Sequence, residues 1–563
     1  MKRIFIATLF VLAAAHAGAQ TMYDALTFSK NNYYGTARSI GMGNAMTAVG
    51  GDLGSIGINP AGSAVAGYSQ FTITPNLTVS ILNSSYSAYP DAQGVDHYIN
   101  ERNNTFTRFS MPNIGATFNF NTGRNYGLQT ITYGFVLNGT NNFTDKMMAG
   151  GVNDRTSYLG AMASSSYGYD IDIMNGFRDV DMNEIDVWDY AYYNTNIPFN
   201  SIVNAQAGAI SNYGYDTDSD YYWRYVGATE IPFPAGVDDQ GNNLYDIELG
   251  GPLDQTYGRM ITGSKYDALF NVGFNFNNRF YLGANLGITG LNYNFDEYFK
   301  EYAQDPADFP INLTDKNGNP YMINFNNYRT RYSYAANGTG IYGKFGFIAK
   351  PIEGLRLGAA IQTPTAMQIS EIWKHAVDIH YNGAQARDGE AASPEGNYDY
   401  RLRSPYRINA GVAYTIMRMA LISLDYEMTD YSSMRFRSRD GGYGTFDGVN
   451  DDIASYMGMS HMIRVGAECK PIPEFAIRAG YNFSMTPEDI GNETLQDKLN
   501  IFSAGIGYSS PGSFFADLAA RFWTMSDEYV SPYAYPEADN LVTPLILNKR
   551  SRMDFTVTIG FRF

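Results

Sequence analysis

Apolar and polar residues alternate with a period of two over the last residues of the chain. From Met553 to Phe563 every odd-numbered residue is apolar, and the even-numbered ones are Asp, Thr, Gly or Arg. The same alternation occurs at 268–276, 280–288 and 475–483. Because successive side chains of a strand point to opposite faces, each segment predicts a strand with one apolar face. The opposite rows are rich in Gly and Asn. This favours a barrel with lipid outside and water inside over a soluble sandwich, because the two sheets of a sandwich share one apolar core.

Fourteen such segments can be counted. They lie at 69–83, 106–120, 125–139, 259–276, 279–293, 332–349, 355–369, 404–417, 419–432, 460–470, 474–486, 498–509, 512–525 and 551–563. Short connections such as 277–278 and 510–511 alternate with long ones such as 84–105, 140–258, 294–331, 370–403 and 526–550. This layout predicts an all-β fold, a transmembrane antiparallel barrel of about 14 strands with its long loops at one end.

The first nineteen residues have the pattern of a signal peptide. Lys2 and Arg3 precede an apolar run from Ile4 to Ala15, and the small residues of Ala17–Ala19 follow it. This pattern predicts export and a mature chain that starts at Gln20. We therefore expect a signal peptide at 1–19, a glycine-rich segment at 20–67, and a barrel at 68–563 with a large outer loop at about 140–258.

Composition narrows the class of protein further. A single Cys in 563 residues excludes an internal disulfide framework, and a net charge of −17 argues against binding of nucleic acid. After the N-terminus no uncharged apolar run of 18 residues occurs, which argues against membrane-spanning helices. Residues 145–258 hold 18 Asp or Glu and 4 Lys or Arg. This stretch is either a solvated acidic surface or a surface for divalent cations or partners.

Motifs for catalysis or metal binding occur in the wrong context. Gly338–Phe345 contains Gly-x-Gly-x-x-Gly, but the residues after it continue with strand periodicity, whereas a phosphate loop needs a helix there. His375 and His380 are five residues apart and do not converge on a strand or a helix. The Asp residues at 216–220 begin like a calcium loop but lack its Gly and Glu. We expect no enzymatic activity, no cofactor and no metal site, and weak calcium binding by the acidic stretch stays open.

Strand parity nominates residues that face the lumen. Eight charged side chains lie on the strand faces opposite the lipid-facing rows. We expect them to point inward, because a charge in hydrocarbon would be very costly. They are Arg356, Asp425, Glu427, Arg464, Glu468, Arg478, Asp517 and Arg521. They form either a salt-bridge network that stiffens the wall or a polar conduit with an Arg row that binds carboxylates.

Two prolines interrupt the first two predicted strands. Pro75 and Pro112 have no N–H to donate to a ladder, and central barrel strands normally avoid proline. If residue 83 lies opposite 106, residue 75 lies opposite 114, within about two residues of Pro112. We predict a bulge or kink there that opens the wall toward lipid, unless the prolines lie at strand ends.

The segment from Ser39 to Gly62 carries a family resemblance. It contains a Gly-Met-Gly run followed by the signature Asn59, Pro60, Ala61 and Gly62, and it resembles the N-terminal hatch of the FadL/TodX family of outer-membrane transporters for hydrophobic compounds. The stretches beginning at Gly343, Leu421 and Ile463 are also similar to this family, whereas the outer loops differ in size. The resemblance implies a fourteen-stranded barrel plugged from the N-terminus, a hatch at Asn59–Gly62 that gates the lumen, and a lateral exit near the N-terminal strands. From its residues alone, Asn59–Gly62 is equally a tight turn.

Together these features predict passive uptake of hydrophobic small molecules, such as long-chain fatty acids, through a gated barrel in a bacterial outer membrane. The expected partners are that ligand and membrane lipids or lipopolysaccharide, and a monomer is favoured. One alternative is a barrel that acts as a scaffold or shuttle partner in protein secretion. Another is a general porin, against which the glycine-rich plug argues.

Overall fold

The computed structural model describes most of the chain after the predicted signal peptide, which lies outside the described residues. The described residues are 20–88, 98–176, 186–194, 197–212, 222–237, 243–315, 317–417, 419–439, 446–485, 487, 498–536 and 541–563.

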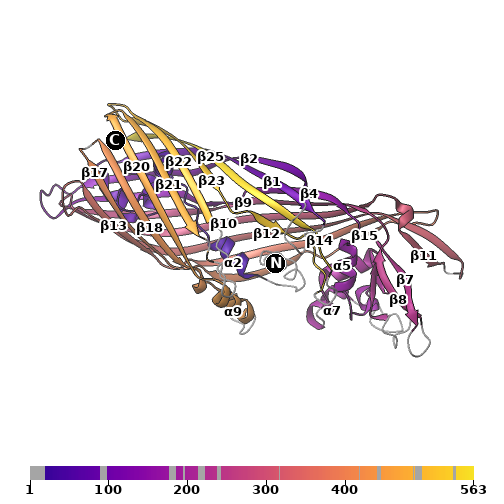
Figure 1. The fold of residues 1–563 in the computed structure, drawn as a ribbon. Helices are drawn as coiled ribbons and strands as arrows, with labels where there is room; N and C mark the ends of the chain where they lie inside the picture. The colour runs from indigo at the N-terminus through magenta and orange to yellow at the C-terminus, as the bar shows by residue number, and fades with distance from the viewer. Residues whose placement is uncertain are drawn as a thin grey trace.

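These residues form a closed antiparallel barrel of fourteen strands (Figure 1). In order around the wall the strands are β1 (Gln70–Ser87), β2 (Ile99–Asn121), β3 (Leu128–Asn142), β9 (Leu253–Phe276), β10 (Phe280–Ala303), β12 (Pro320–Ala349), β13 (Leu355–Gln362), β17 (Arg407–Ile416), β18 (Ala420–Asp430), β20 (Met459–Ile472), β21 (Phe475–Met485), β22 (Lys498–Ser509), β23 (Phe514–Thr524) and β25 (Leu545–Arg562). Pairing of β1 with β25 closes the ring. The predicted fold class and number of strands are confirmed.

The outer face of the barrel is an apolar band. Phe109 is 67% exposed and Phe270 is 49% exposed, and Ile361, Leu424 and Ile559 are among many others on the same face. A closed ring satisfies its own backbone hydrogen bonds, and an apolar band outside it is the architecture of integral outer-membrane proteins.

The strands continue well beyond the band on the side of the long connections. β10 and β12 remain paired up to Tyr302 and Asn327, where a loop at 294–331 was predicted. Likewise β14 (Ala366–Asn382) and β16 (Gly396–Arg403) occupy much of the predicted loop at 370–403. These loop boundaries were wrong because the strands stay paired above the band, where inward residues such as Phe299, Tyr328 and Val377 pack against another part of the chain instead of the hatch.

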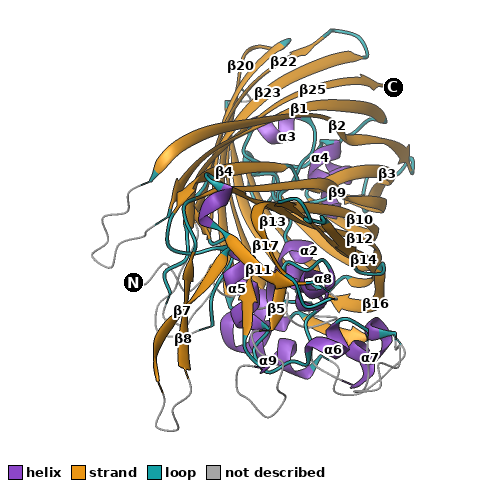
Figure 2. Cartoon of the chain, turned by 90° about the vertical axis from the view of Figure 1, so that its right-hand side faces the viewer, coloured by secondary structure: helices purple, strands orange, loops and turns teal. Residues whose placement is uncertain are grey.

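The segment before β1 fills the lumen, and we call residues 20–67 the hatch. It contains α2 (Met22–Ser29), α3 (Ala37–Gly41), α4 (Leu53–Ile56) and the 3₁₀ turn η2 (Pro60–Val65). Figure 2 shows α3 and α4 inside the ring of strands. The predicted plug inside the barrel is confirmed, and the inward glycines make room for its backbone: a Cβ at Gly283 would collide with Ala61, and one at Gly480 with Gly43.

The largest connection forms a cap beside the outer mouth. It contains α5 (Tyr158–Ser165), α6 (Ile171–Met174), α7 (Val187–Asn194), α8 (Phe199–Gln206), β5 (Ile210–Asn212), β6 (Tyr225–Gly227), β7 (Glu230–Val237) and β8 (Asn243–Leu249), with β4 (Asp145–Asn153) leading into it. These helices gather on one side of the mouth (Figure 2). Tyr158 stacks on Phe299 and Tyr328 of the wall, with ring centroids 5.3 and 5.7 Å apart. The acidic stretch is therefore partly a packed core and not wholly a solvated loop.

None of the helices in the described part of the chain is both long enough and apolar enough to cross a membrane.

The last residue closes the seam of the barrel. Phe563 N donates to Ser69 O at 3.0 Å, Ser69 N donates to Phe563 O at 3.1 Å, and the Phe563 ring contacts Phe118.

We predict that deletion of Phe563 lowers the folded, heat-modifiable fraction on gels, because both seam bonds are lost and each contributes about 1 kcal/mol. Phe563→Tyr, which keeps the backbone and the ring, is the control and should fold like the wild type. An unchanged folded fraction in the deletion variant would contradict this role.

Candidate functional site

The hatch is built from short turns that cap their own backbone. Thr21 and Asp24 form a capping box at α2, and the side chains of Thr36 and Asp52 cap α3 and α4. Each cap satisfies an N–H that would otherwise be buried without a partner. The Thr36 hydroxyl also donates to Asp52 at 2.6 Å, which ties two of these turns together. These caps act together with buried apolar side chains of the same segment, such as Met42, Met46 and Ile58, to make it compact.

Asn59 joins η2, the rest of the hatch and the wall. Its Nδ2 donates to Thr47 O at 2.7 Å and to Phe347 O of β12 at 3.0 Å, and its Oδ1 accepts from Ala61 N. Pro60 occupies the first position of the turn, where an N–H is not needed. Asn59–Gly62 is thus a capped turn docked on the wall, and its gating role stays a prediction.

The eight lumen candidates all project from the wall toward the hatch or toward one another. Five hold hatch backbone or side chains directly: Arg356 donates to Val49 O at 2.6 Å, Asp425 accepts from Thr47 N at 2.7 Å, Arg521 donates to Tyr33 O at 3.0 Å, Glu427 accepts from the Tyr33 hydroxyl at 3.2 Å, and Glu468 pairs with Arg38 at 2.9 Å.

The other three candidates, Arg464, Arg478 and Asp517, complete chains of ion pairs behind these contacts. Arg464, which is 0% exposed, pairs with Glu427 at 3.1 Å, and Arg478 pairs with both Glu468 and Asp517 at 2.6 Å. Neither sequence interpretation included the hatch as a partner of these charges. Their contacts make them the polar attachment of the hatch to the wall.

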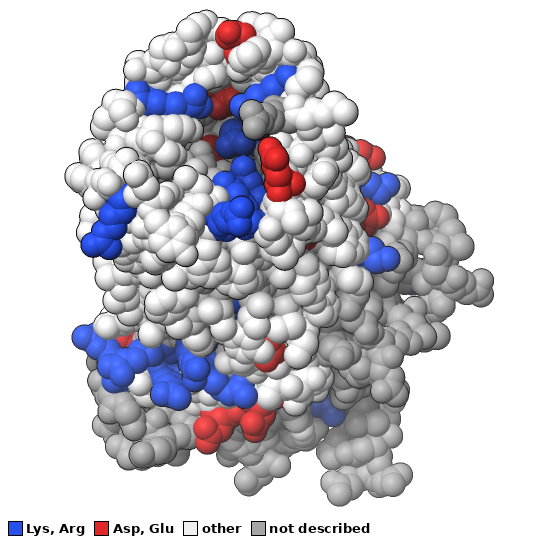
Figure 3. Space-filling model, turned by 90° about the vertical axis from the view of Figure 1, so that its left-hand side faces the viewer, with Lys and Arg blue, Asp and Glu red and all other residues white. Residues whose placement is uncertain are grey.

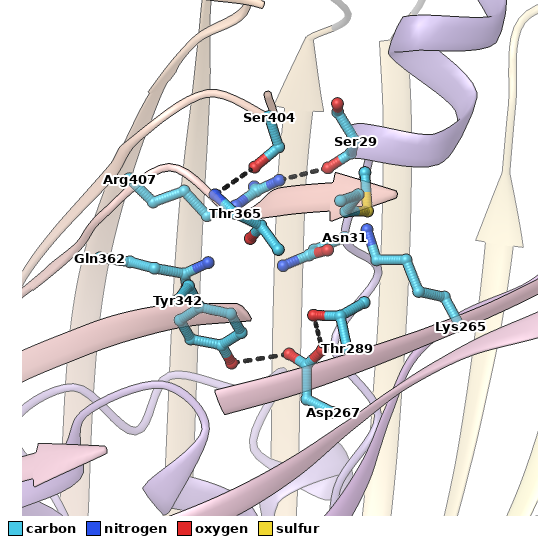
Figure 4. Close-up of a pocket in the computed structure, with 11 residues that line it drawn as sticks. Ser29, Asn31, Lys265, Asp267, Thr289, Tyr342, Gln362, Thr365, Ser404 and Arg407 are labelled. Atoms are coloured by element: carbon cyan, nitrogen blue, oxygen red, sulfur yellow. Dashed lines mark hydrogen bonds between the residues drawn. The ribbon is translucent and has the colours of Figure 1, made fainter. Parts of the chain in front are cut away.

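A small polar cavity lies between the end of α2 and the wall (Figure 4). Its lining comes from the hatch, β9, β10, β12, β13, β14 and β17. The lining residues are Ser29, Asn31, Lys265, Asp267, Thr289, Tyr342, Gln362, Thr365, Met367, Ser404 and Arg407. Lys265 and Asp267 lie on the inward face of β9, which parity at Asn271 and Asn275 already indicates, but the sequence interpretation missed them.

Two buried cations face this cavity. Lys265 is 5% exposed, and its Nζ donates to Phe28 O and Lys30 O at 2.9 and 3.0 Å, with no described carboxylate within ion-pair distance. Arg407 donates to Ser29 O at 2.5 Å and pairs with Glu427 at 3.4 Å. Asp267 accepts from the hydroxyls of Thr289 and Tyr342, each at 2.7 Å. The cavity therefore has the chemistry to hold one anionic group.

The wall beside the cavity is interrupted on two neighbouring strands. Pro364 separates β13 from β14, and Pro405 separates β16 from β17. On one side of the break β14 pairs with β16 up to Ala366–Arg403, and on the other side β13 pairs with β17 from Gln362–Arg407. Side chains bridge the break, since Thr365 N donates to Ser404 Oγ at 2.9 Å. A single predicted strand at 355–369 was therefore wrong at Pro364, because proline cannot donate to the ladder.

Pro75 and Pro112 lie next to one another in the first hairpin. The register passes from Thr74–Asn113 to Asn76–Ser110, so Pro75 lies opposite residues 111–112, at an irregularity in the ladder. The pairing of β1 with β2 resumes beyond it, so the prolines kink this hairpin without separating its strands.

The wall parts on the other side of Pro112. The backbone ladder between β2 and β3 runs from Asn121–Thr130 only as far as Asn113–Asn138, and beyond that point no described residue of β2 forms a ladder with β3 or β4. Side chains of β2 cross the break instead: Arg108 donates to Asn142 Oδ1 at 3.0 Å and Asn104 to Met148 O at 3.2 Å. β3 turns to the hatch instead: Asn32 N donates to Thr140 O at 2.6 Å and Tyr34 N to Gly139 O at 3.1 Å. Gly139 lies against Pro112, where a Cβ would be 3.2 Å from the ring. The part of β2 above this point carries the exposed Met111 and Phe109.

The remaining motifs have structural places. Gly338–Phe345 lies within β12, and Lys344 donates from Nζ to Gly57 O of the hatch at 2.8 Å. His375 is buried against Tyr332, and His380 pairs with Asp388. In the described part of the chain no three His, Cys, Asp or Glu residues group as metal ligands, and the Asp residues at 216–220 lie outside it.

No family model and no curated protein matches this chain. Among solved structures it is similar to a Pseudomonas aeruginosa FadL homologue, with 12% identity, a TM-score of 0.47, and coverage of 95% of this chain and 99% of that one. It is also similar to the P. putida toluene transporter TodX (12% identity, TM-score 0.44, 94% and 98% covered) and the Ralstonia pickettii toluene transporter TbuX (12%, 0.42, 94% and 98%).

We predict that Gly346→Ala loosens the hatch, because the new Cβ would collide with Asn59, and such overpacking costs about 1–3 kcal/mol. Limited proteolysis of the folded barrel should then cleave residues 20–67 faster than in the wild type. Gly290→Ala on β10, where a Cβ meets no atom within 4 Å, is the matched control. Equal protection of the hatch in both variants would show that Asn59 does not anchor it.

Proposed function

We propose that this protein takes up hydrophobic small molecules across the outer membrane by passive diffusion, with a lateral exit between β2 and β3. The parting of these strands at Asn113–Asn138 carries the proposal. A hydrophobic solute needs a way from the lumen into lipid that avoids water, whereas a hydrophilic solute needs only an open pore. The resemblance of Asn59–Gly62 to the hatch of hydrophobic-compound transporters supports the same function.

The position of the parting supports this route. Leu77 of β1 pairs with Phe555 of β25, and both are exposed on the apolar band, just beyond Pro75. Pro112 is opposite Pro75, so the parting is at the depth of hydrocarbon. A solute that passes between β2 and β3 would therefore enter the membrane directly.

In the described state the hatch blocks this route. The backbone bonds of Asn32 and Tyr34 to Thr140 and Gly139 hold it against the strand that turns inward. The Asn32 side chain adds a bond to Asn141 at 3.1 Å. A shift of residues 31–34 would release these contacts and connect the cavity at Asn31 and Lys265 to the parting. No covalent step and no cofactor is needed for transport down a gradient.

For the ligand we propose a long-chain fatty acid whose carboxylate binds Lys265 and Arg407. Its chain would take the place of the apolar side chains of α2, where Leu26 and Phe28 pack against Met367, Ile369 and Leu402 of the wall. The acyl chain would then occupy the apolar surface that the α2 side chains leave. The carboxylate would take the place of the backbone carbonyls that bind the two cations.

A cross-link between the hatch and β3 tests the route. In a Cys469→Ser background, Asn32→Cys and Asn141→Cys joined by a short bis-thiosulfonate cross-linker should abolish uptake of labelled fatty acid, and reductant should restore it.

The control is the pair Asn83→Cys and Asn103→Cys, whose native side chains are 2.7 Å apart across β1 and β2 and do not touch the hatch. This cross-link should leave uptake unchanged. Normal uptake through the protein with the hatch cross-linked would refute the lateral route.

A change at Lys265 tests the carboxylate site separately. Lys265→Gln should weaken fatty acid binding by about tenfold or more, because a hydrogen bond to a charged group is lost, while binding of an uncharged hydrocarbon such as toluene stays the same. Lys344→Gln, which removes another lysine bound to hatch backbone but outside the cavity, is the control. Equal weakening of both ligands in the Lys265 variant would reject the carboxylate assignment and leave the lateral route standing.

A further inference from the structure

Four arginines form two directly opposed pairs on the outside of the wall. β16 pairs with β19 (Arg435–Ser438) so that Arg401 lies opposite Arg437 and Arg403 opposite Arg435. The residues between them, Leu402 and Phe436, are buried, so the arginines are on the outward face. We call these four residues the arginine patch. It is a basic surface on a chain whose net charge is −17.

The charge of this patch is not balanced within the described chain. Arg401, Arg403 and Arg437 are exposed and have no described carboxylate within 4 Å, and Arg435 donates only to the backbone carbonyls of Ser432 and Met434. Arg439, two residues beyond Arg437, does pair with Asp399, so carboxylates are available nearby. Like charges directly opposite on paired strands destabilise a sheet, so an anion from outside the protein would stabilise this patch.

The patch lies directly above the apolar band, on the side of the long loops. Below Arg403 the outward residues of the wall are Tyr406 and then Ile408, and the adjacent β18 presents Leu424 and Tyr426. At the upper edge of the band on β10 and β12 the exposed pair is the neutral Asn292 and Asn337. Figure 3 shows a group of Lys and Arg side chains in the lower part of the view, with a few Asp and Glu below it.

We propose that the arginine patch binds the phosphate groups of a phosphorylated lipid in the outer leaflet of the membrane. The headgroup of such a lipid lies at the edge of the hydrocarbon, where the guanidinium groups are, and its acyl chains lie along Ile408, Leu424 and Tyr426. A guanidinium binds a phosphate through two parallel hydrogen bonds, so two opposed pairs provide sites for a headgroup with more than one phosphate. This inference goes beyond transport, because the patch is outside the lumen and does not touch the hatch.

The test compares binding of lipid A carrying both phosphates with binding of enzymatically dephosphorylated lipid A, by native mass spectrometry of the full-length mature protein in non-ionic detergent. Arg401→Gln with Arg437→Gln should weaken binding of the phosphorylated lipid by about tenfold, and the wild type should bind the dephosphorylated lipid equally weakly. Inorganic phosphate at millimolar concentration should not displace the lipid, which separates a lipid site from a phosphate site.

The control removes two exposed arginines from the opposite end of the barrel, by Arg124→Gln with Arg279→Gln, and should bind like the wild type. Thermal unfolding gives a second readout: the patch variant should melt above the wild type in lipid-free detergent, where the arginines repel one another, and lose this advantage when phosphorylated lipid A is added. Binding that does not depend on the phosphates or on Arg401 and Arg437, or a patch variant less stable without lipid, would overturn the proposal.

Discussion

The direct contact between hatch backbone and the inner face of the wall is the constraint on which the rest of this structure depends. Backbone that lies inside a barrel at membrane depth must find partners there, because bulk water does not reach it. Small inward residues such as Gly283, Gly346 and Gly480 let the chain approach the wall, and asparagines and charged side chains then satisfy its amides and carbonyls. The same set of inward residues thus provides both the space and the bonds.

This constraint also explains why the proposed exit is lateral and why the cavity is divided between two parts of the chain. The hatch occupies the lumen, so the structure has no continuous path along the barrel axis. Instead, a strand of the wall exchanges one backbone partner for another. β3 leaves β2 because the hatch offers Asn32 and Tyr34 as alternative backbone partners, and the polar cavity is directly beside this exchange. The two buried cations, Lys265 and Arg407, bond to hatch carbonyls there.

Much of the wall could be predicted from the sequence, because lipid on one face and polar contacts on the other leave a period of two in segments such as 553–563. The prediction was less accurate wherever a second strand or the hatch decides the outcome. The upper halves of β10 and β12 are held by pairing with each other and by packing of Phe299 and Tyr328 against the cap. Pro75 and Pro112 indicated an irregular hairpin, but the parting at Asn138 depends on backbone bonds to residues more than one hundred positions away, which no local pattern records. The rows of inward glycines could be recognised in the sequence, but the hatch residues that each glycine contacts could not.

The anchoring charges of the hatch have a consequence for the order of folding. The hatch is made first on the ribosome, but the residues that hold it, among them Asp425, Glu468 and Arg521, belong to β18, β20 and β23 near the end of the chain. The groups of the hatch that these residues bind, Thr47 N, the Arg38 side chain and Tyr33 O, therefore have no wall partner until these strands exist. Docking of the hatch and closure of β1 on β25 then become one late cooperative event, so that a wall without its last strands cannot hold a finished plug.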